Sequence, residues 1–375
     1  MGIYELSTPS FLIDLDQMEA NIKSVQKLCD DNSKELWPMV KTHKSSQLAK
    51  MQMEAGAKGF LVGTLDEAKI LAQKGAKRIT YAYPVAGEEN LNRVIEINKD
   101  TELYVSIDCK EQLKPLDDKL EANHMKIKAL IIIDSGLGRF GVQPDDVTKL
   151  AADVARYKNI ELAGISTHPG HVYASQNMED VKKYAKQEVT AIKTAKDKLI
   201  NAGYKVDMVA TGSTPTMSFA AKDENITVLR PGNYIFYDNI QMSMGLVKEE
   251  DCAMTVLATV ISHPKEGQYL IDAGTKCFGL DKGAHGISLV EGYGFIKGHP
   301  ELIISDLSEE VGKIEVKGKT NIKIGDKLRI IPNHTCSSAN CTNYLIGHRG
   351  DEIKEVIKMD MRGGSVRRPP IVGNK

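Results

Sequence analysis

Short apolar runs alternate with amphipathic segments through the first two thirds of the chain. Eight runs rich in β-branched residues are predicted as strands, at 36–40, 59–62, 78–83, 102–107, 128–134, 161–167, 206–210 and 227–229. Helical periodicity lies between several of them, at 65–74, 88–98, 144–157 and 177–202. Apolar strands separated by helices are typical of a parallel sheet buried on both faces. Eight such strands predict a TIM (β/α)8 barrel, with a doubly wound open sheet as the alternative.

The pattern changes after about residue 237. Later apolar segments are short, β-rich and joined by Gly, Pro and Asp-Lys turns, at 253–262, 268–272, 313–316 and 326–332. We predict a barrel over residues 15–237, followed by a mainly-β C-terminal domain. The early apolar segment 10–14 is assigned to that second domain, which then comprises residues 1–14 and 238–375.

Length and charge limit the classes of protein that fit. A chain of 375 residues exceeds one compact core, and a formal charge of −1 leaves no basic surface typical of nucleic-acid binding. No apolar run approaches the roughly 20 residues that span a bilayer. The first residues do not resemble a signal peptide, and the six cysteines are scattered. We therefore expect a cytoplasmic protein without nucleic-acid or membrane partners.

Lys41 is the most informative single residue of the chain. An apolar run ends on Val40, so Lys41 is expected at the carboxyl end of a buried strand, where active-site residues of a barrel lie. Desolvation at such a position frees a lysine amine as a nucleophile for Schiff-base chemistry. A lysine that points into water is the ordinary alternative. Lys44 is the rival, but the apolar run leads directly into Lys41.

Polar side chains also follow the fifth and sixth predicted strands. Arg139 ends the glycine-rich segment Asp134-Ser-Gly-Leu-Gly-Arg139, and His168 and Tyr173 follow the next strand. Each alone is more often a surface or structural residue than a catalytic one. Their shared position at strand ends makes them candidates for one site.

Two short turns follow the seventh and eighth predicted strands. They contain Ser213 and Thr214 in Gly212-Ser-Thr-Pro-Thr216, and Gly232 and Asn233 in Arg230-Pro-Gly-Asn233. Backbone N–H groups of such turns bind phosphate, although a helix cap explains the first turn equally well. A lysine, an arginine and a phosphate cradle on neighbouring strand ends together predict a pyridoxal 5'-phosphate site.

A possible metal pair lies in the β-rich part. Alternate residues of an extended segment point to the same side, so His334 and Cys336 could bind one cation together. Imidazole and thiolate favour zinc, with manganese or magnesium as alternatives, and two protein ligands leave positions open for substrate. A chance pair on a loop is the competing interpretation. Cys341 is a second nearby thiol, but it lacks the two-residue spacing.

The layout resembles the fold-type III pyridoxal-phosphate family, in which an alanine racemase-like barrel precedes a β domain. Lys41-Thr-His-Lys44 is similar to the branch of D-threonine aldolases and D-serine dehydratases, and so are the segments 134–139, 212–216 and 230–234. The resemblance extends over nearly the whole chain, from Thr8 to Gly363.

The resemblance implies roles for the candidate residues. Lys41 would be linked to the cofactor, and Arg139 would lie near the phenolic oxygen of the cofactor. The remaining cofactor-binding candidates are His168, Tyr173, Ser213, Thr214, Arg230, Gly232 and Asn233. His334 and Cys336 would bind a divalent metal. Relatives form dimers, so we expect a homodimer.

The resemblance also implies a metal-dependent lyase that acts on D-3-hydroxy amino acids. A thiolate ligand favours D-serine dehydratase-like β-elimination to a keto acid and ammonia, because typical D-threonine aldolases have His-x-Asp at this place. Retro-aldol cleavage to glycine and an aldehyde is the alternative. An amino-acid racemase is a lesser alternative, since the segment Asp272–Cys277 lacks the tyrosine that racemases use, although Tyr293 lies further on.

Overall fold

The apolar runs of the first part of the chain form one parallel sheet in the computed structural model, which describes residues 1–283 and 288–363. The strand order is β2-β9-β8-β7-β6-β5-β4-β3, and a parallel bridge between Met39 and Leu61 joins the two ends. The sheet is thus a nearly closed barrel, which confirms the predicted fold class. Its strands are β2 (Glu35–Leu36), β3 (Phe60–Val62), β4 (Arg78–Pro84), β5 (Glu102–Ile107), β6 (Ile127–Ile132), β7 (Ile160–Ser166), β8 (Met208–Thr211) and β9 (Val228–Leu229).

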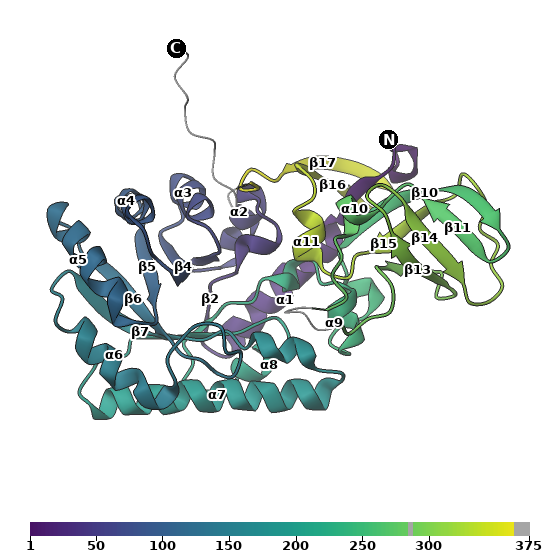
Figure 1. Cartoon of the computed structure of the whole chain (residues 1–375). Helices are drawn as coiled ribbons and strands as arrows, with labels where there is room; N and C mark the ends of the chain where they lie inside the picture. The colour runs from purple at the N-terminus through teal and green to yellow at the C-terminus, as the bar shows by residue number, and fades with distance from the viewer. Residues whose placement is uncertain (284–287, 364–375) are drawn as a thin grey trace, which may run out of the picture.

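Helices alternate with these strands and surround the barrel (Figure 1). Their apolar faces pack on the strands, and capping residues such as Thr64 and Asn177 start two of them. The helices are α1 (Leu15–Asp31), α2 (Ser46–Ala55), α3 (Leu65–Gln73), α4 (Glu88–Ile97), α5 (Leu113–Ala122), α6 (Val147–Val154), α7 (Met178–Asn201), α8 (Met217–Ala220) and α9 (Asn239–Ser243). No helix in the described part is long and apolar enough to cross a membrane.

Single 3-10 turns lie in the connections, several of them at the carboxyl ends of the barrel strands. They are η1 (Ile3–Glu5), η2 (Val40–Thr42), η3 (Lys110–Gln112), η4 (Pro144–Asp146), η5 (Gly170–Ala174), η6 (Asn233–Ile235) and η7 (Glu249–Asp251). Of these, η2, η5 and η6 include residues that line the cavity described below.

A second, mostly antiparallel sheet contains the remaining strands. Its order is β13-β14-β11-β10-β1-β16-β17, with β15 paired to β10 and β12. The strands are β1 (Ser10–Asp14), β10 (Met254–Lys265), β11 (Gln268–Ile271), β12 (Phe295–Ile296), β13 (Leu302–Leu307), β14 (Gly312–Val316), β15 (Lys327–Ile331), β16 (Tyr344–Arg349) and β17 (Glu352–Lys358), with the short helices α10 (Thr275–Phe278) and α11 (Thr335–Ala339).

The N-terminal strand β1 lies inside the second sheet, where it pairs with β10 and β16 (Figure 1). Helix α1 then leads into the barrel, and its buried Met18 and Ile22 share an apolar cluster with the second sheet. The division at residues 14/15 and 237/238 stays a prediction, and residues 284–287 and 364–375 of the second part lie outside the described residues.

The first barrel strand is shorter than predicted. Strand β2 ends at Leu36, and Lys41 lies in η2 rather than directly at a strand end. Pro38 has no N–H group, so it offers no donor toward β3, although its carbonyl accepts a hydrogen bond from the Leu61 N–H group at 3.0 Å. The N–H groups of Trp37 and Met39 still donate to carbonyl groups of the β9 segment, at 2.9 Å each. The backbone therefore continues to the mouth of the barrel, and Lys41 follows there.

The prediction of an extended segment at His334 and Cys336 is wrong. Strand β15 ends at Ile331, and Cys336 lies in the first turn of α11, with His334 as the N-cap residue. The buried Asp238 carboxylate accepts a hydrogen bond from the Thr335 N–H group at 3.1 Å, which holds the start of this helix. The C-terminal part is mainly β, as predicted, but it also contains the short helices α10 and α11.

Gly164 permits the close pairing of β7 with β8. Its φ is +155°, and a Cβ atom would lie 1.9 Å from the Met208 carbonyl oxygen. We expect Gly164→Ala to lower the free energy of unfolding by about 3 kcal/mol or more. Gly318→Ala is the control, because its Cβ would meet nothing closer than 3.8 Å, and we expect a change within about 0.5 kcal/mol. Urea denaturation measures both; equal effects would contradict this account of the pairing.

Candidate active site

All of the predicted site residues line one cavity at the mouth of the barrel. Loops after the barrel strands contribute Lys41, Arg139, His168, Tyr173, Ser213, Thr214, Arg230, Gly232 and Asn233, and the start of α11 contributes His334 and Cys336. The rival residues Lys44, Cys341 and Tyr293 are not among the described residues that line it. The fold therefore brings together residues that are almost 300 positions apart in sequence.

Two lysines that are close in sequence have different environments. Lys41 is partly exposed and lines the cavity. Lys44 is buried, and its ammonium group pairs with the fully buried carboxylate of Glu67. Glu67 also accepts a hydrogen bond from the Gly63 N–H group at 2.7 Å, which fixes the carboxylate at the start of α3. The ion pair occupies the Lys44 amine, so Lys41 is the lysine available for covalent chemistry.

The two predicted phosphate turns lie side by side. The Thr214 hydroxyl accepts a hydrogen bond from the Tyr234 N–H group at 3.1 Å, which joins the two turns. Gly232 packs closely against the β2 segment, because a Cβ atom would lie 3.0 Å from Met39. The backbone N–H groups of Thr214, Gly232 and Asn233 donate to no other described residue. These free donors at the cavity fit a phosphate group.

A buried carboxylate on α7 holds the first phosphate turn. Glu188 accepts hydrogen bonds from the Thr211 hydroxyl and from the Gly212 N–H group, the latter at 3.0 Å. Burial raises the pKa of Glu188 to about 7, although these hydrogen bonds and Arg230 oppose the shift. The side chain is thus partly protonated near neutral pH.

Arg230 places a buried cation at the bottom of the same site. Its guanidinium donates to the Thr167 carbonyl at 2.9 Å, and its Nε group has no hydrogen-bond partner in the described part of the chain. Burial lowers the pKa of Arg230 to about 10, while Glu188 opposes the shift. A buried donor without a partner fits an acceptor group on a bound cofactor.

The remaining predicted side chains surround the opening. Arg139 is exposed, and its guanidinium lies over the rings of Phe140 and Tyr83, 5.3 and 5.9 Å from their centroids. Asp134 accepts hydrogen bonds from N–H groups within the 134–139 loop, which shapes the loop that carries Arg139. Tyr173 is buried, and burial raises the pKa of its phenol. His168 lines the cavity beside it.

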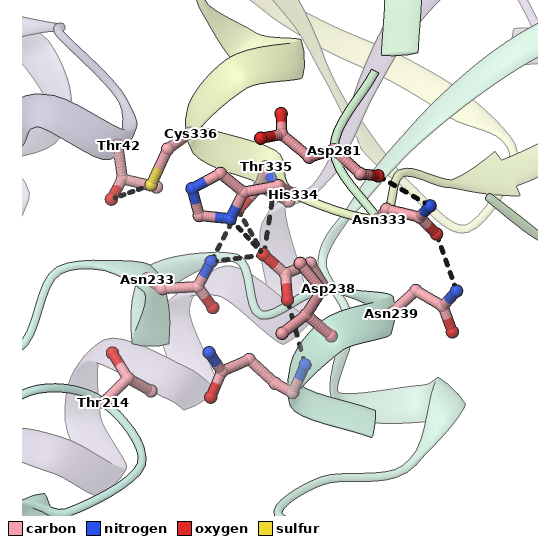
Figure 2. A network of polar contacts seen from close by, with 12 residues as sticks. Thr42, Thr214, Asn233, Asp238, Asn239, Asp281, Asn333, His334, Thr335 and Cys336 are labelled. Atoms are coloured by element: carbon pink, nitrogen blue, oxygen red, sulfur yellow. Dashed lines mark hydrogen bonds and ion pairs between the residues drawn. The ribbon is translucent and has the colours of Figure 1, made fainter. Parts of the chain in front are cut away.

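His334, the N-cap residue of α11, and Cys336 in its first turn lie side by side and line the cavity (Figure 2). Burial alone would raise the pKa of the Cys336 thiol, but His334 and Lys41 outweigh burial and lower it. Burial would lower the pKa of His334, yet Cys336 and Asp238 raise it well above its ordinary value. The Thr42 hydroxyl lies 3.1 Å from the Cys336 sulfur. Imidazole and thiol are together a donor set that suits a divalent cation such as zinc.

The two side chains would leave a bound metal incompletely coordinated by protein. Within residues 1–283 and 288–363, no group of three or more His, Cys, Asp or Glu side chains is arranged to hold a metal ion. A catalytic metal keeps a coordination position open for water or substrate, whereas protein ligands fill every position of a structural site. The donor set therefore fits a metal that binds substrate.

Comparison with known proteins identifies the family. The family model described as "Alanine racemase, N-terminal domain" matches residues 13–239, and the one described as "Putative serine dehydratase domain" matches residues 253–347. The chain belongs to the alanine racemase N-terminal domain family. The expected family is thereby confirmed. The second match confirms that the resemblance to D-serine dehydratases extends into the C-terminal part of the chain.

Similarity to individual enzymes extends over almost the whole chain. D-serine dehydratase of Dictyostelium discoideum is 31% identical over 94% of this chain and 96% of its own length. D-threo-3-hydroxyaspartate dehydratase of Delftia sp. is 31% identical over 89% of this chain and 92% of its own length. The solved structure of the Delftia enzyme has a TM-score of 0.88 at 29% identity and covers 95% of this chain and 98% of its own, and a mutant of that enzyme is described as in the metal-free form. These relatives confirm that the chain is an enzyme of the pyridoxal-phosphate lyase type.

Sequence reasoning missed the residues that hold the site in place. Glu67, Glu188 and Asp238 are each fully buried and bind backbone or side-chain groups of the cavity loops. Glu67 could have been found from the sequence, because Thr64 and Glu67 have the spacing of a helix capping box. Glu188 lies on the buried side of a long amphipathic helix, where a carboxylate is unexpected.

Glu188 provides a test of the electrostatics of this site. Its pKa is raised in the folded state to about 7, so the proton is bound more tightly by the folded than by the unfolded chain. The contribution to stability is complete below the unfolded pKa and is lost as pH rises through 7. Relative to Glu188→Gln, the wild type should lose roughly 3 kcal/mol of unfolding free energy between pH 4.5 and 7.5. Urea denaturation at several pH values measures this; a pH-independent difference would contradict the assignment.

Proposed function

We propose that this protein is a metal-dependent pyridoxal-phosphate lyase acting on D-3-hydroxy amino acids, with D-serine dehydratase-like β-elimination as its reaction. One juxtaposition carries the proposal: an available lysine and an anion cradle on the barrel face an imidazole–thiol pair on α11 across one cavity. The names of the relatives, a D-serine dehydratase and a D-threo-3-hydroxyaspartate dehydratase, support the same reaction and substrate class.

Different residues of the cavity would bind different parts of the cofactor. Lys41 would bind it covalently. The Thr214, Gly232 and Asn233 N–H groups would bind its phosphate, with Ser213 beside them. Arg230 offers its unpartnered Nε group to an acceptor on the ring, and Arg139 would lie near the phenolic oxygen. His168 and Tyr173 would line the ring. When bound, pyridoxal 5'-phosphate supplies an electron sink for bonds at the carbon that bears the substrate amine.

The chain's own groups would then move the protons. With substrate bound, the Lys41 amine would remove the proton from Cα of the substrate. His334 and Cys336 would hold the divalent metal, zinc by the donor set, which supplies a Lewis acid for the β-hydroxyl. Loss of the Cα proton and the β-hydroxyl, together as water, would give an enamine. Its imine tautomer would then be hydrolysed by one water molecule to the keto acid and ammonia. Manganese and magnesium are less well matched to a thiolate.

Retro-aldol cleavage is the second candidate, because it needs the same two centres and differs only in which bond breaks. A D-threonine aldolase of Arthrobacter sp. is 26% identical over 96% of this chain. The thiolate of Cys336 favours dehydration over this alternative. A racemase has less support, since Tyr293 packs under the Lys282 ammonium, 4.4 Å from the ring centroid, and does not line the cavity in the described part. A homodimer, implied by the resemblance, and a cytoplasmic location, expected from the sequence, remain proposals.

Product analysis tests the reaction. We expect zinc-loaded holoenzyme to release keto acid and ammonia from D-serine or D-threo-3-hydroxyaspartate, and to lose this activity when a chelator removes the metal. Keto acid and aldehyde are assayed separately. Aldehyde and glycine from D-threonine would favour the aldolase, and no turnover of any D-3-hydroxy amino acid would sink the proposal.

The two lysines provide a matched pair of variants. We expect Lys41→Ala to lose the visible absorbance of lysine-linked pyridoxal phosphate. Lys44→Ala should keep that absorbance but lose about 3–5 kcal/mol of stability, because the buried Glu67 carboxylate is left unpaired. Absorbance and urea denaturation measure the two effects. Retained absorbance in Lys41→Ala together with its loss in Lys44→Ala would assign the cofactor to Lys44 instead.

A further inference from the structure

Asp238 connects the two halves of the candidate site (Figure 2). The residue is fully buried and lies between η6, which follows the last barrel strand, and α9. One carboxylate oxygen, Oδ1, accepts a hydrogen bond from the Gln241 N–H group at 3.0 Å and caps α9. The other oxygen, Oδ2, points toward the cavity residues.

The Oδ2 atom of Asp238 contacts both sides of the cavity. It accepts a hydrogen bond from the Asn233 side-chain amide at 2.5 Å, and another from the Thr335 N–H group at 3.1 Å. The Nδ1 atom of His334 lies 3.4 Å away, at an ion-pair distance rather than that of a well-formed hydrogen bond. No lysine or arginine of the described residues pairs with this carboxylate. Asn233 belongs to the phosphate turn, whereas His334 and Thr335 belong to the metal side.

The contact with Asp238 determines how His334 can bind a metal. A carboxylate beside Nδ1 favours the imidazole form that has its proton on Nδ1, which leaves the lone pair of Nε2 for a cation. Figure 2 shows the ring between Asp238 and Cys336, with the Nδ1 edge toward the carboxylate. The ring therefore has its metal-binding nitrogen on the side away from Asp238.

The same carboxylate determines which groups of Asn233 can bind phosphate. The side-chain amide nitrogen of Asn233 is engaged by Asp238 and, at 2.9 Å, by the Thr335 hydroxyl. The Asn233 side chain consequently has no donor left for the cofactor, and its backbone N–H group takes that role. Asp238 thus fixes the turn whose backbone would bind the phosphate.

We propose that Asp238 is a positioning residue that couples binding of the cofactor phosphate to binding of the metal. A phosphate bound at Gly232 and Asn233 orders this turn, the ordered amide holds Asp238, and Asp238 holds His334 in its metal-binding orientation. Coupling of this kind is reciprocal, so the metal strengthens cofactor binding by the same factor. The inference rests on the proposed function, because it takes both ligands from that proposal.

Asp238→Asn tests this role while keeping the fold. Asparagine caps a helix as well as aspartate does, so α9 keeps its N-terminal acceptor. The change removes the charge beside His334 and places an amide where three donors converge. The control is Asn239→Ala, which removes a 2.8 Å hydrogen bond to Asn333 in the same network. Among the described residues, the Asn239 side chain shares no hydrogen bond or ion pair with His334 or Asn233. Circular dichroism and thermal melting check that both variants fold.

Zinc affinity of the holoenzyme is the first readout, measured by competition with a chromophoric chelator rather than by activity. We expect Asp238→Asn to bind zinc about 10- to 100-fold more weakly than wild type, and Asn239→Ala to bind it as wild type does. Cofactor dissociation is the second readout. Removing zinc should weaken cofactor binding by about 5- to 150-fold in wild type and have no effect in Asp238→Asn.

The outcomes separate this inference from the proposed function. Wild-type zinc affinity in Asp238→Asn, or equal loss in both variants, would overturn the positioning role. If the affinity of the wild-type protein for the cofactor is the same with and without zinc, the coupling is overturned. This holds even if D-serine is still converted to keto acid. A wild-type holoenzyme that binds no zinc at all would instead overturn the proposed metal site.

Discussion

The contact between the barrel mouth and the start of α11 is the constraint on which the candidate site depends. The barrel supplies a lysine and a phosphate cradle, but the imidazole and thiol come from the other sheet. The buried Asp238 carboxylate binds groups from both sides, and the Thr42 hydroxyl contacts the Cys336 sulfur at 3.1 Å. These polar contacts are directional, so they fix the relative position of the two centres more closely than apolar packing alone would.

Buried carboxylates also determine which cations remain available in the cavity. Glu67 pairs with Lys44, and Glu188 lies close enough to Arg230 to influence its ionisation. Lys41 has no such carboxylate partner within the described residues and lines the cavity. A cation with a buried carboxylate partner stabilises the fold, because breaking the pair costs folding free energy. A lysine without such a partner can act as a base or a nucleophile. The two lysines, three residues apart, therefore have different surroundings: Lys44 is buried and paired, whereas Lys41 lines the cavity.

Much of this arrangement could be predicted from the sequence. Long apolar strands with intervening helices indicate a parallel barrel, and a barrel places strand-end residues such as Lys41, Thr214 and Asn233 together. What could not be predicted depends on tertiary contacts. Lys41 lies in η2 beyond the short strand β2, and the segment after His334 is a helix whose first N–H group binds Asp238, 97 positions away in sequence. The roles of Glu188 and Asp238 could not be predicted either, since no sequence pattern around a single acidic residue indicates which distant groups it binds.

We propose that one cavity holds a lysine-linked cofactor on the barrel and a metal at the start of α11. Anomalous diffraction at the zinc absorption edge, from crystals of zinc-loaded holoenzyme, tests it most directly. We predict continuous electron density from Lys41 to the cofactor, and an anomalous peak in contact with the His334 imidazole and the Cys336 sulfur. Cofactor density on Lys44, or a zinc peak away from both His334 and Cys336, would contradict the account.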